Sequence, residues 1–274
     1  MSQDLTDRHA LSLHRRRALQ APALFLHELA RDELLDRRDT VNRSFTAPAV
    51  VTPYPQLWES VLPGARIVAD DEVLALEPGA HDLVLHALAL HWSNDPVGQM
   101  VQARRALRPD GLFLAAMFGG RTLTELRASL AQAETAVSGG LSPRVLPMGE
   151  IRDLGALLQR AGLALPVADA QDHVVSYRDL FHLMSDLRAM GETNALTDRR
   201  REVPSRAMFV EAARLYAEAF PEGDSRIRAT FEMIFLSGWA PDESQPKPLR
   251  PGSAVQRLSD ALGVAERPLE PGED

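Results

Sequence analysis

The stretch that decides the fold is Ala80-His81-Asp82-Leu83-Val84-Leu85-His86-Ala87-Leu88-Ala89-Leu90. It is apolar for most of its length and shows no alternation, which is typical of a strand covered on both faces, as in a parallel sheet. Ser93-Asn94-Asp95-Pro96 follows it and predicts a helix with Asp95 as the N-cap and Pro96 at the first helical position.

The segments on either side repeat this rhythm. Arg108–Gly111 has the composition of a turn, and Leu112–Phe118 predicts the next buried strand. On the other side, Ala49–Thr52 predicts a strand, Tyr54–Leu62 one helix, and Ala65–Ala69 a further strand. About a dozen residues join these two strands, which leaves room for a single crossover and for no strand between them. The order predicts a doubly wound α/β sheet with ligands at the carboxyl ends of its strands.

The remaining segments predict helices around this core and a late return to the sheet. Leu24–Arg38 predicts a helix, and the preceding run Arg15-Arg16-Arg17 is expected on a solvent-facing helix side. Gly149–Ala161 predicts a helix closed by Gly162. The expected parts are a helical N-terminal segment (1–46), a Rossmann-like core (47–177), a helical insertion (178–228), a returning strand (229–240) and a partly disordered tail (241–274).

Composition excludes several classes of protein. The 274 residues carry a net charge of −8, so binding to nucleic acid is not favoured. Cysteine is absent, which excludes disulfides, thiolate metal sites and a cysteine nucleophile. No apolar run is long enough to span a membrane, and the N-terminal residues do not resemble a secretory signal, so a cytoplasmic location is expected.

Three motifs carry a resemblance to a known family. They are His91-Trp92-Ser93-Asn94-Asp95, Phe118-Gly119-Gly120-Arg121-Thr122-Leu123-Thr124-Glu125-Leu126-Arg127 and Met190-Gly191-Glu192-Thr193-Asn194. From about Asp7 to Gly263 the chain resembles the class I S-adenosylmethionine-dependent methyltransferases. Within them it is most similar to the branch of the mitochondrial respiratory complex I assembly factor that hydroxylates an arginine of a complex I subunit. That branch is related to the malonyl-carrier-protein methyltransferases.

The chain departs from this family at the cofactor loop. Between Phe45 and Asp82 the only glycines are Gly64 and Gly79, and Val51-Thr52-Pro53-Tyr54-Pro55 stands where the family has a glycine-rich loop. Ala65–Glu72 resembles the family's third strand and its acidic turn. The resemblance therefore implies an α/β, Rossmann-like class I methyltransferase fold that is truncated by about one βα unit. The acid that holds the cofactor ribose in the family is lost with that unit.

The resemblance also implies the site residues. On the cofactor side they are Asp70, Asp71, Leu90 and His91. Because the cofactor loop departs from the family, the resemblance implies that binding of S-adenosylmethionine is weakened or lost. For a substrate or partner pocket they are Trp92, Gly119, Gly120, Arg121, Glu125, Glu192 and Asn194. Structural roles stand beside these: Asp70-Asp71-Glu72 as a solvated turn, Gly119-Gly120 as a tight strand exit, and Met190–Asn194 as a cap and turn. No metal site and no catalytic residue is identified.

Three functions follow. The first is a methyltransferase-fold protein that aids assembly of respiratory complex I by binding a subunit, with weakened or lost S-adenosylmethionine binding. The second is an active S-adenosylmethionine-dependent methyltransferase or protein-arginine hydroxylase with an atypical cofactor site. The third is a non-enzymatic interaction module. A crevice filled by Tyr54 and Trp58 near Thr52, Asp70 and His91 would argue against the second.

Overall fold

The computed structural model describes residues 4–223 and 225–246. Most of the predicted tail lies outside these residues. The helices are α1 (Arg8–Ala18), α2 (Phe25–Thr40), η1 (Pro55–Leu57), η2 (Leu90–Trp92), α3 (Pro96–Ala106), α4 (Thr124–Ser138), α5 (Ile151–Arg160), α6 (Leu180–Ala189) and α7 (Arg206–Ala219). The strands are β1 (Pro48–Val51), β2 (Arg66–Val68), β3 (His81–Ala87), β4 (Leu107–Phe118), β5 (Ala164–Tyr177), β6 (Pro221–Glu222) and β7 (Arg226–Trp239).

One sheet organises these elements, with the strand order β2-β1-β3-β4-β7-β5 and with β6 paired to β7. Strands β2, β1, β3 and β4 are mutually parallel, whereas β7 is antiparallel to both β4 and β5. The predicted α/β architecture is confirmed. β3 is buried along its whole length, as expected for a strand covered on both faces.

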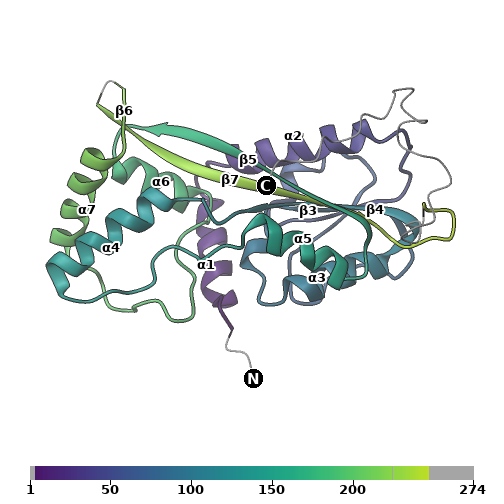
Figure 1. Ribbon diagram of the computed structural model, residues 1–274, viewed down its shortest axis with the longest axis horizontal. Helices are drawn as coiled ribbons and strands as arrows, with labels where there is room; N and C mark the ends of the chain where they lie inside the picture. The colour runs from purple at the N-terminus through teal and green to yellow at the C-terminus, as the bar shows by residue number, and fades with distance from the viewer. Residues whose placement is uncertain (1–3, 224, 247–274) are drawn as a thin grey trace, which may run out of the picture. The chain divides into compact units, whose positions relative to one another are not determined.

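Two hydrophobic clusters cover the two faces of the sheet, because side chains alternate along each strand. Val50 and Leu85 pack in the cluster that contains residues of α2. Their neighbours Val51 and Val84 pack in the cluster formed with α3 and α5. Figure 1 shows the same arrangement, with α2 on one side of β3 and β4 and with α3 and α5 on the other.

The connection from β1 to β2 confirms the predicted truncation. Val50 of β1 pairs directly with Ile67 of β2 in parallel register, and no strand lies between them. The predicted helix over Tyr54–Leu62 is wrong. Only the 3-10 turn η1 forms there, followed by hydrogen-bonded turns.

The predicted turn at Arg108–Gly111 is an irregularity at the start of β4 instead of a separate element. His81 pairs with Leu107 and Leu83 with Leu112, so the extra residues bulge from the ladder, and Asp110 takes a φ of 59°. The cap of α3 is confirmed, since the Asp95 carboxylate accepts a hydrogen bond from the Gly98 amide at 2.7 Å.

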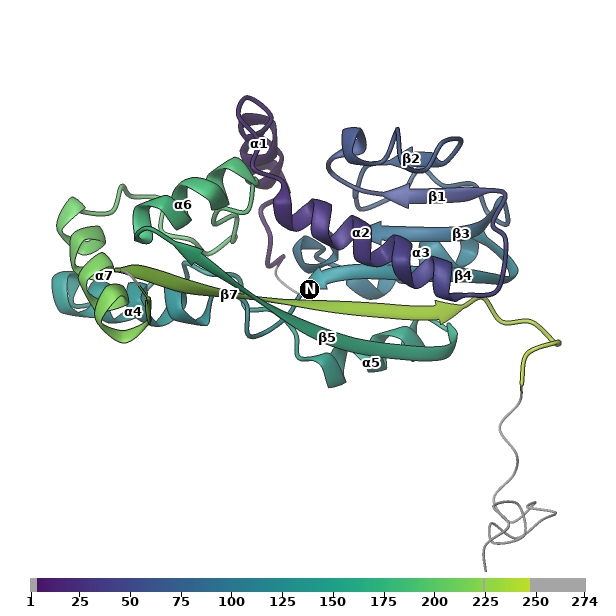
Figure 2. The same cartoon turned by 90° about the horizontal axis from the view of Figure 1, so that it is seen from above.

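The helical insertion lies between the two long strands β5 and β7. β5 begins at Ala164, and β7 begins at Arg226, three residues before the returning strand predicted at 229–240. Figure 2 shows α4, α6 and α7 gathered at the opposite end of the sheet from β1 and β2, with α1 beside α6. Within the described residues, no helix combines the length and the apolar character that a membrane span requires.

Candidate functional site

The carboxyl end of β1, where the family's cofactor loop would stand, is filled by aromatic side chains. Tyr54 is fully buried and Trp58 is 1% exposed. The Tyr54 hydroxyl donates a hydrogen bond to the Met190 carbonyl at 2.5 Å. The edge of the His27 ring packs against the Tyr54 ring, with centroids 4.7 Å apart. The crevice near Thr52 is therefore occupied by the chain's own residues.

Asp70, which follows β2, is also engaged. Arg15 Nη1 lies 2.8 Å from both of its carboxylate oxygens, and Arg8 Nη1 lies 3.2 Å from one of them. Burial disfavours the charged carboxylate, but Arg15 and Arg8 outweigh it and lower the pKa of Asp70 to about 2. The predicted solvent-facing position is wrong for Arg15, which is buried because its guanidinium turns inward to Asp70.

The other residues predicted for the cofactor side lie nearby in different settings. Asp71 is exposed, and its carbonyl accepts a hydrogen bond from Gln99 Nε2 at 2.5 Å. Leu90 is buried in the hydrophobic cluster that α3 and α5 cover. The His91 ring is fully enclosed and faces Glu192. Of the four residues predicted for the cofactor side, Asp70 and His91 have buried polar side chains.

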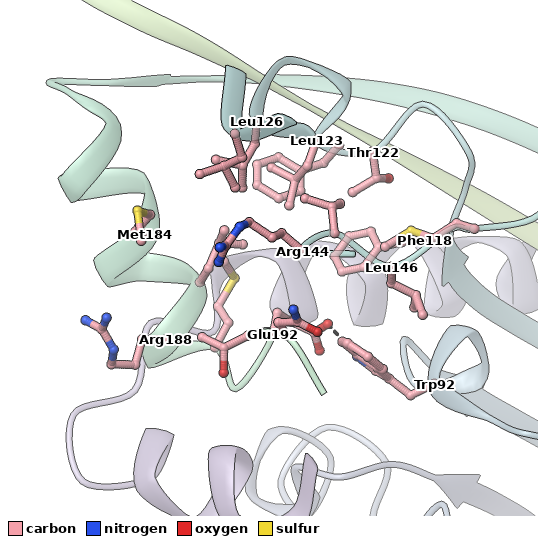
Figure 3. A pocket seen from close by; sticks show the side chains of 18 of the residues that line it. Trp92, Phe118, Thr122, Leu123, Leu126, Arg144, Leu146, Met184, Arg188 and Glu192 are labelled. Carbon is pink, nitrogen blue, oxygen red and sulfur yellow. Dashed lines mark hydrogen bonds between the residues drawn. The ribbon is translucent and has the colours of Figure 1, made fainter. Parts of the chain in front are cut away.

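A cavity of about 220 Å³ opens beyond the end of β4, under the helical insertion (Figure 3). Apolar side chains make up most of its wall. It is lined by Trp92, Phe118, Thr122, Leu123, Leu126, Leu130, Arg144, Val145, Leu146, Met148, Met184, Leu187, Arg188, Met190, Glu192, Thr193, Asn194, Phe209 and Phe231.

Glu192 is the one carboxylate among these lining residues, and it is held by neighbours from several elements. Its Oε2 accepts a hydrogen bond from Trp92 Nε1 at 2.7 Å and lies 3.1 Å from His91 Nε2. The Phe118 amide donates to His91 Nδ1 at 3.5 Å, which leaves His91 Nε2 to donate to Glu192. His27 Nε2 lies 3.9 Å from Glu192 Oε1.

These contacts leave Glu192 charged. Burial opposes its ionisation, but His91, which also donates a hydrogen bond to it, and Arg15 hold the pKa of Glu192 below its usual value. Burial lowers the pKa of His27 to about 4, against the attraction of Glu192, so His27 is neutral at pH 7. The cavity therefore presents a negative charge in an apolar wall at neutral pH.

Two arginines line the cavity and differ in their surroundings. Arg144 donates to both oxygens of the buried Glu134, at 3.0 and 2.7 Å. The Arg144 guanidinium, with a further contribution from Ser142, lowers the pKa of Glu134 to about 2 despite its burial. Arg188 is exposed and turns away from Glu192 (Figure 3). Arg144 is thus neutralised within the fold.

Of the residues predicted for the pocket, Trp92, Glu192 and Asn194 line the cavity. Asn194 Nδ2 donates a hydrogen bond to the Pro143 carbonyl at 2.9 Å, which connects two loops of the wall.

Gly119, Gly120, Arg121 and Glu125 lie outside the lining. Added Cβ atoms at Gly119 and Gly120 would collide with Glu232 and Glu150. Arg121 is largely exposed and pairs with Asp172, while Glu125 Oε1 accepts from Thr230 Oγ1 at 2.5 Å. Sequence reasoning missed Arg15, His27, Glu134 and Arg144 as partners, because each meets its counterpart through the tertiary fold.

A metal centre has no support in the described part of the chain, where no group of three histidine, aspartate or glutamate side chains is arranged to hold an ion.

Comparison with known proteins places the chain in a family. The profile of the family described as "Methyltransferase domain" matches residues 54–115. The human arginine-hydroxylase NDUFAF5, mitochondrial, is 37% identical over 235 residues, which cover 86% of this chain and 68% of the human protein. The chain belongs to the NDUFAF5 family. The zebrafish (Danio rerio) NDUFAF5 is 36% identical over 229 residues, covering 84% of this chain and 71% of that protein.

More distant relatives carry a different activity in their names. The malonyl-[acyl-carrier protein] O-methyltransferase of Xylella fastidiosa is 35% identical over 179 residues, covering 65% of this chain and 58% of that protein. Among solved structures, the YcgJ protein of Bacillus subtilis is similar with a TM-score of 0.48 and 11% identity, covering 77% of this chain and 99% of that one.

The relatives correct one prediction. The cytoplasmic location expected from the sequence is contradicted, because the NDUFAF5 relatives are mitochondrial proteins. The expectation rested on the absence of a signal, and an absence does not identify a compartment. The chain spans 68% of the length of the human NDUFAF5 and 45% of that of the Dictyostelium discoideum relative.

Proposed function

We propose that this protein binds an arginine-containing segment of a respiratory complex I subunit in the cavity beyond β4 and thereby aids assembly of that complex. The observation that carries the proposal is the charged Glu192 in an apolar and aromatic wall. A guanidinium pairs well with a carboxylate through charge-assisted hydrogen bonds, and it stacks favourably on aromatic faces. The NDUFAF5 relatives are named for a reaction of arginine, which supports the same substrate class.

The shape of the wall supports an arginine side chain. Its three methylene groups would lie against Phe118 and Leu146, and its guanidinium would reach the Trp92 ring and the Glu192 carboxylate. Arg144 does not oppose this cation, because Glu134 already neutralises it. A lysine would satisfy the charge but would lack the planar fork that a carboxylate accepts.

We infer that S-adenosylmethionine binding is weakened or lost, because the residues present do not fit this cofactor. Close approach of a cofactor to backbone needs glycine, whereas Tyr54 fills the end of β1. The Asp70 carboxylate is taken by Arg15 and Arg8. The proposed role is therefore binding, and no chemical step is assigned to the chain.

Retained methyltransferase or hydroxylase activity is the second candidate, favoured by the names of the relatives. It would require Tyr54 and α1 to leave the end of β1. An interaction module that does not bind complex I is the third candidate. These alternatives give different outcomes in the experiment below.

The test is deletion of the gene followed by complementation in the source organism. Complex I assembly is measured by native gel electrophoresis. Cells without the gene should accumulate incompletely assembled complex I, and the wild-type gene should restore assembly. The Glu192→Gln variant should restore it poorly, because it removes the negative charge from the cavity. Glu125→Gln is the matched control, since Glu125 is a buried carboxylate that lies outside the cavity.

Normal complex I in cells without the gene would contradict the proposal and favour the interaction module. Equal restoration by the two variants would place partner binding elsewhere on the surface. Full restoration by Glu192→Gln, together with loss of restoration in Thr52→Val, a variant at the end of β1, would favour cofactor-dependent chemistry.

A further inference from the structure

The segment Met190–Asn194, here called the Glu192 loop, leaves the end of α6 and brings Glu192 into the cavity wall. Gly191 has a φ of 76°, a left-handed conformation that favours glycine. The Glu192 amide donates to the Leu187 carbonyl at 2.8 Å, which closes the end of α6. The direction of the Glu192 side chain therefore depends on the residues against which this turn packs.

The Glu192 loop packs against the side chains of Tyr54 and Arg15. The Tyr54 hydroxyl donates to the Met190 carbonyl at 2.5 Å. A Cβ on Gly191 would lie 2.6 Å from the Tyr54 hydroxyl oxygen and 2.9 Å from Arg15 Cγ, so the loop rests directly on both side chains. Burial raises the pKa of Tyr54, which keeps the hydroxyl protonated and able to donate.

Tyr54 is itself rigidly placed. It is fully buried, its amide donates to Thr52 Oγ1 at 3.1 Å, and its ring packs against His27. Arg15 is fixed by its two contacts with Asp70. Tyr54 comes from the segment that stands in place of the cofactor loop and Arg15 from α1, and both contact the Glu192 loop.

We propose that Tyr54 is a positioning residue for Glu192: the side chain that stands in place of the cofactor loop now holds the loop that forms the partner cavity. This rests on the proposed function for its biological meaning, but its geometry can be tested without a partner. A shift of about 1 Å would stretch the 2.7 Å bond between Trp92 and Glu192 beyond hydrogen-bonding distance. Precise placement of Glu192 is what a short guanidinium contact requires.

The test is Tyr54→Phe, read by nuclear magnetic resonance of the Trp92 indole N–H. The chain has three tryptophans, so the resonance is assigned with Trp92→Phe and its carboxylate-bonded position is calibrated with Glu192→Gln. Tyr54→Phe should move the Trp92 resonance toward its position in Glu192→Gln and leave Trp239 unchanged. Tyr216→Phe is the matched control. It removes another buried tyrosine bond to a carbonyl, from Tyr216 on α7 to Arg228 at 2.9 Å, which does not involve the Glu192 loop.

An unmoved Trp92 resonance in folded Tyr54→Phe would overturn the proposal, as would an equal shift in Tyr216→Phe. If Tyr54→Phe does not fold, Gly191→Ala gives a second route, because its methyl group must push the loop off Tyr54 and shift the same resonance. An unmoved Trp92 resonance in Gly191→Ala would also overturn the proposal.

Binding of N-acetyl-L-arginine methylamide separates this inference from the proposed function. Affinity should fall about tenfold in Tyr54→Phe, a loss of the size expected for one hydrogen bond. It should stay at the wild-type value in Tyr216→Phe. If the wild type does not bind this probe, the proposed function fails while the Trp92 resonance still decides the positioning role.

Discussion

At the residue scale, Glu192 combines features that rarely coexist in a binding wall. It is 5% exposed, charged, and bonded through Oε2 to Trp92 and His91. Its Oε1 has no hydrogen-bond partner among the described residues, so a cation that bonded to this oxygen would satisfy a buried charge.

The residue-scale prediction concerns direct binding. Titration calorimetry with N-acetyl-L-arginine methylamide should give saturable heat, and Glu192→Gln should weaken affinity by roughly 10- to 100-fold, the loss of one charged hydrogen bond. The uncharged citrulline analogue is the ligand control, and Glu125→Gln the protein control. Equal affinity for the arginine and citrulline probes would show that Glu192 does not select a guanidinium.

At the element scale, α1 is attached to the end of β2 by charge. Arg8 and Arg15 lie on α1 and both reach Asp70, while Asp7 at its N-cap pairs with Arg199 at 2.9 Å. The pKa of Asp70 falls from 3.8 to about 2 on folding. A depressed carboxyl pKa stabilises the folded state above pH 4, and that stabilisation is lost as the pH falls from about 4 toward 2.

The element-scale prediction is that Asp70→Asn lowers the unfolding free energy at pH 6 by about 3 kcal/mol, because Arg15 loses its buried partner. Between pH 6 and pH 3 this variant should lose about 1 kcal/mol less than the wild type, since the Asp70 titration is gone. Urea unfolding at both pH values measures this. Asp71→Asn changes the adjacent, exposed acid and should follow the wild type; a parallel pH dependence in Asp70→Asn would contradict the ion-pair account.

At the scale of the whole molecule, the sheet keeps the class I order at its centre and lacks one βα unit beside β1. Removal of that unit lets β2 pair directly with β1, and α1 and Tyr54 close the space at the carboxyl ends. The whole-molecule prediction is that 1 mM S-adenosylmethionine does not shift the melting temperature. The acid for the cofactor ribose is lost, and the Asp70 carboxylate is paired with Arg15 and Arg8. The loss of two charged contacts would weaken binding of S-adenosylmethionine by about 100-fold or more.

The Xylella malonyl-[acyl-carrier protein] O-methyltransferase serves as the positive control in the same assay. Because ligand at 100 times its dissociation constant adds about 2.7 kcal/mol of stability, tight binding would raise the melting temperature by several degrees. Such a rise in this protein would restore the methyltransferase or hydroxylase hypothesis.

Sequence patterns predicted the parts of the fold that depend on interactions between residues close in the chain. The cap Asp95, the unbroken apolar run of β3 and the single connection to β2 all followed from residue type and spacing. The motif containing Glu192 pointed to the cavity. The roles of Arg15 and Tyr54 did not follow, because an arginine run is ordinarily solvated and a tyrosine after a strand is ordinarily part of the core.

The sequence by itself determined the α/β class, the missing βα unit, the family and the motifs that line the cavity, because these depend on periodicity, on chain length and on strings of residues. Only the tertiary structure decided what fills the end of β1 and what Glu192 touches. Arg15 meets Asp70 and Tyr54 meets Met190 across long stretches of chain. Such pairings arise from how the helices and strands pack, and no local pattern encodes them.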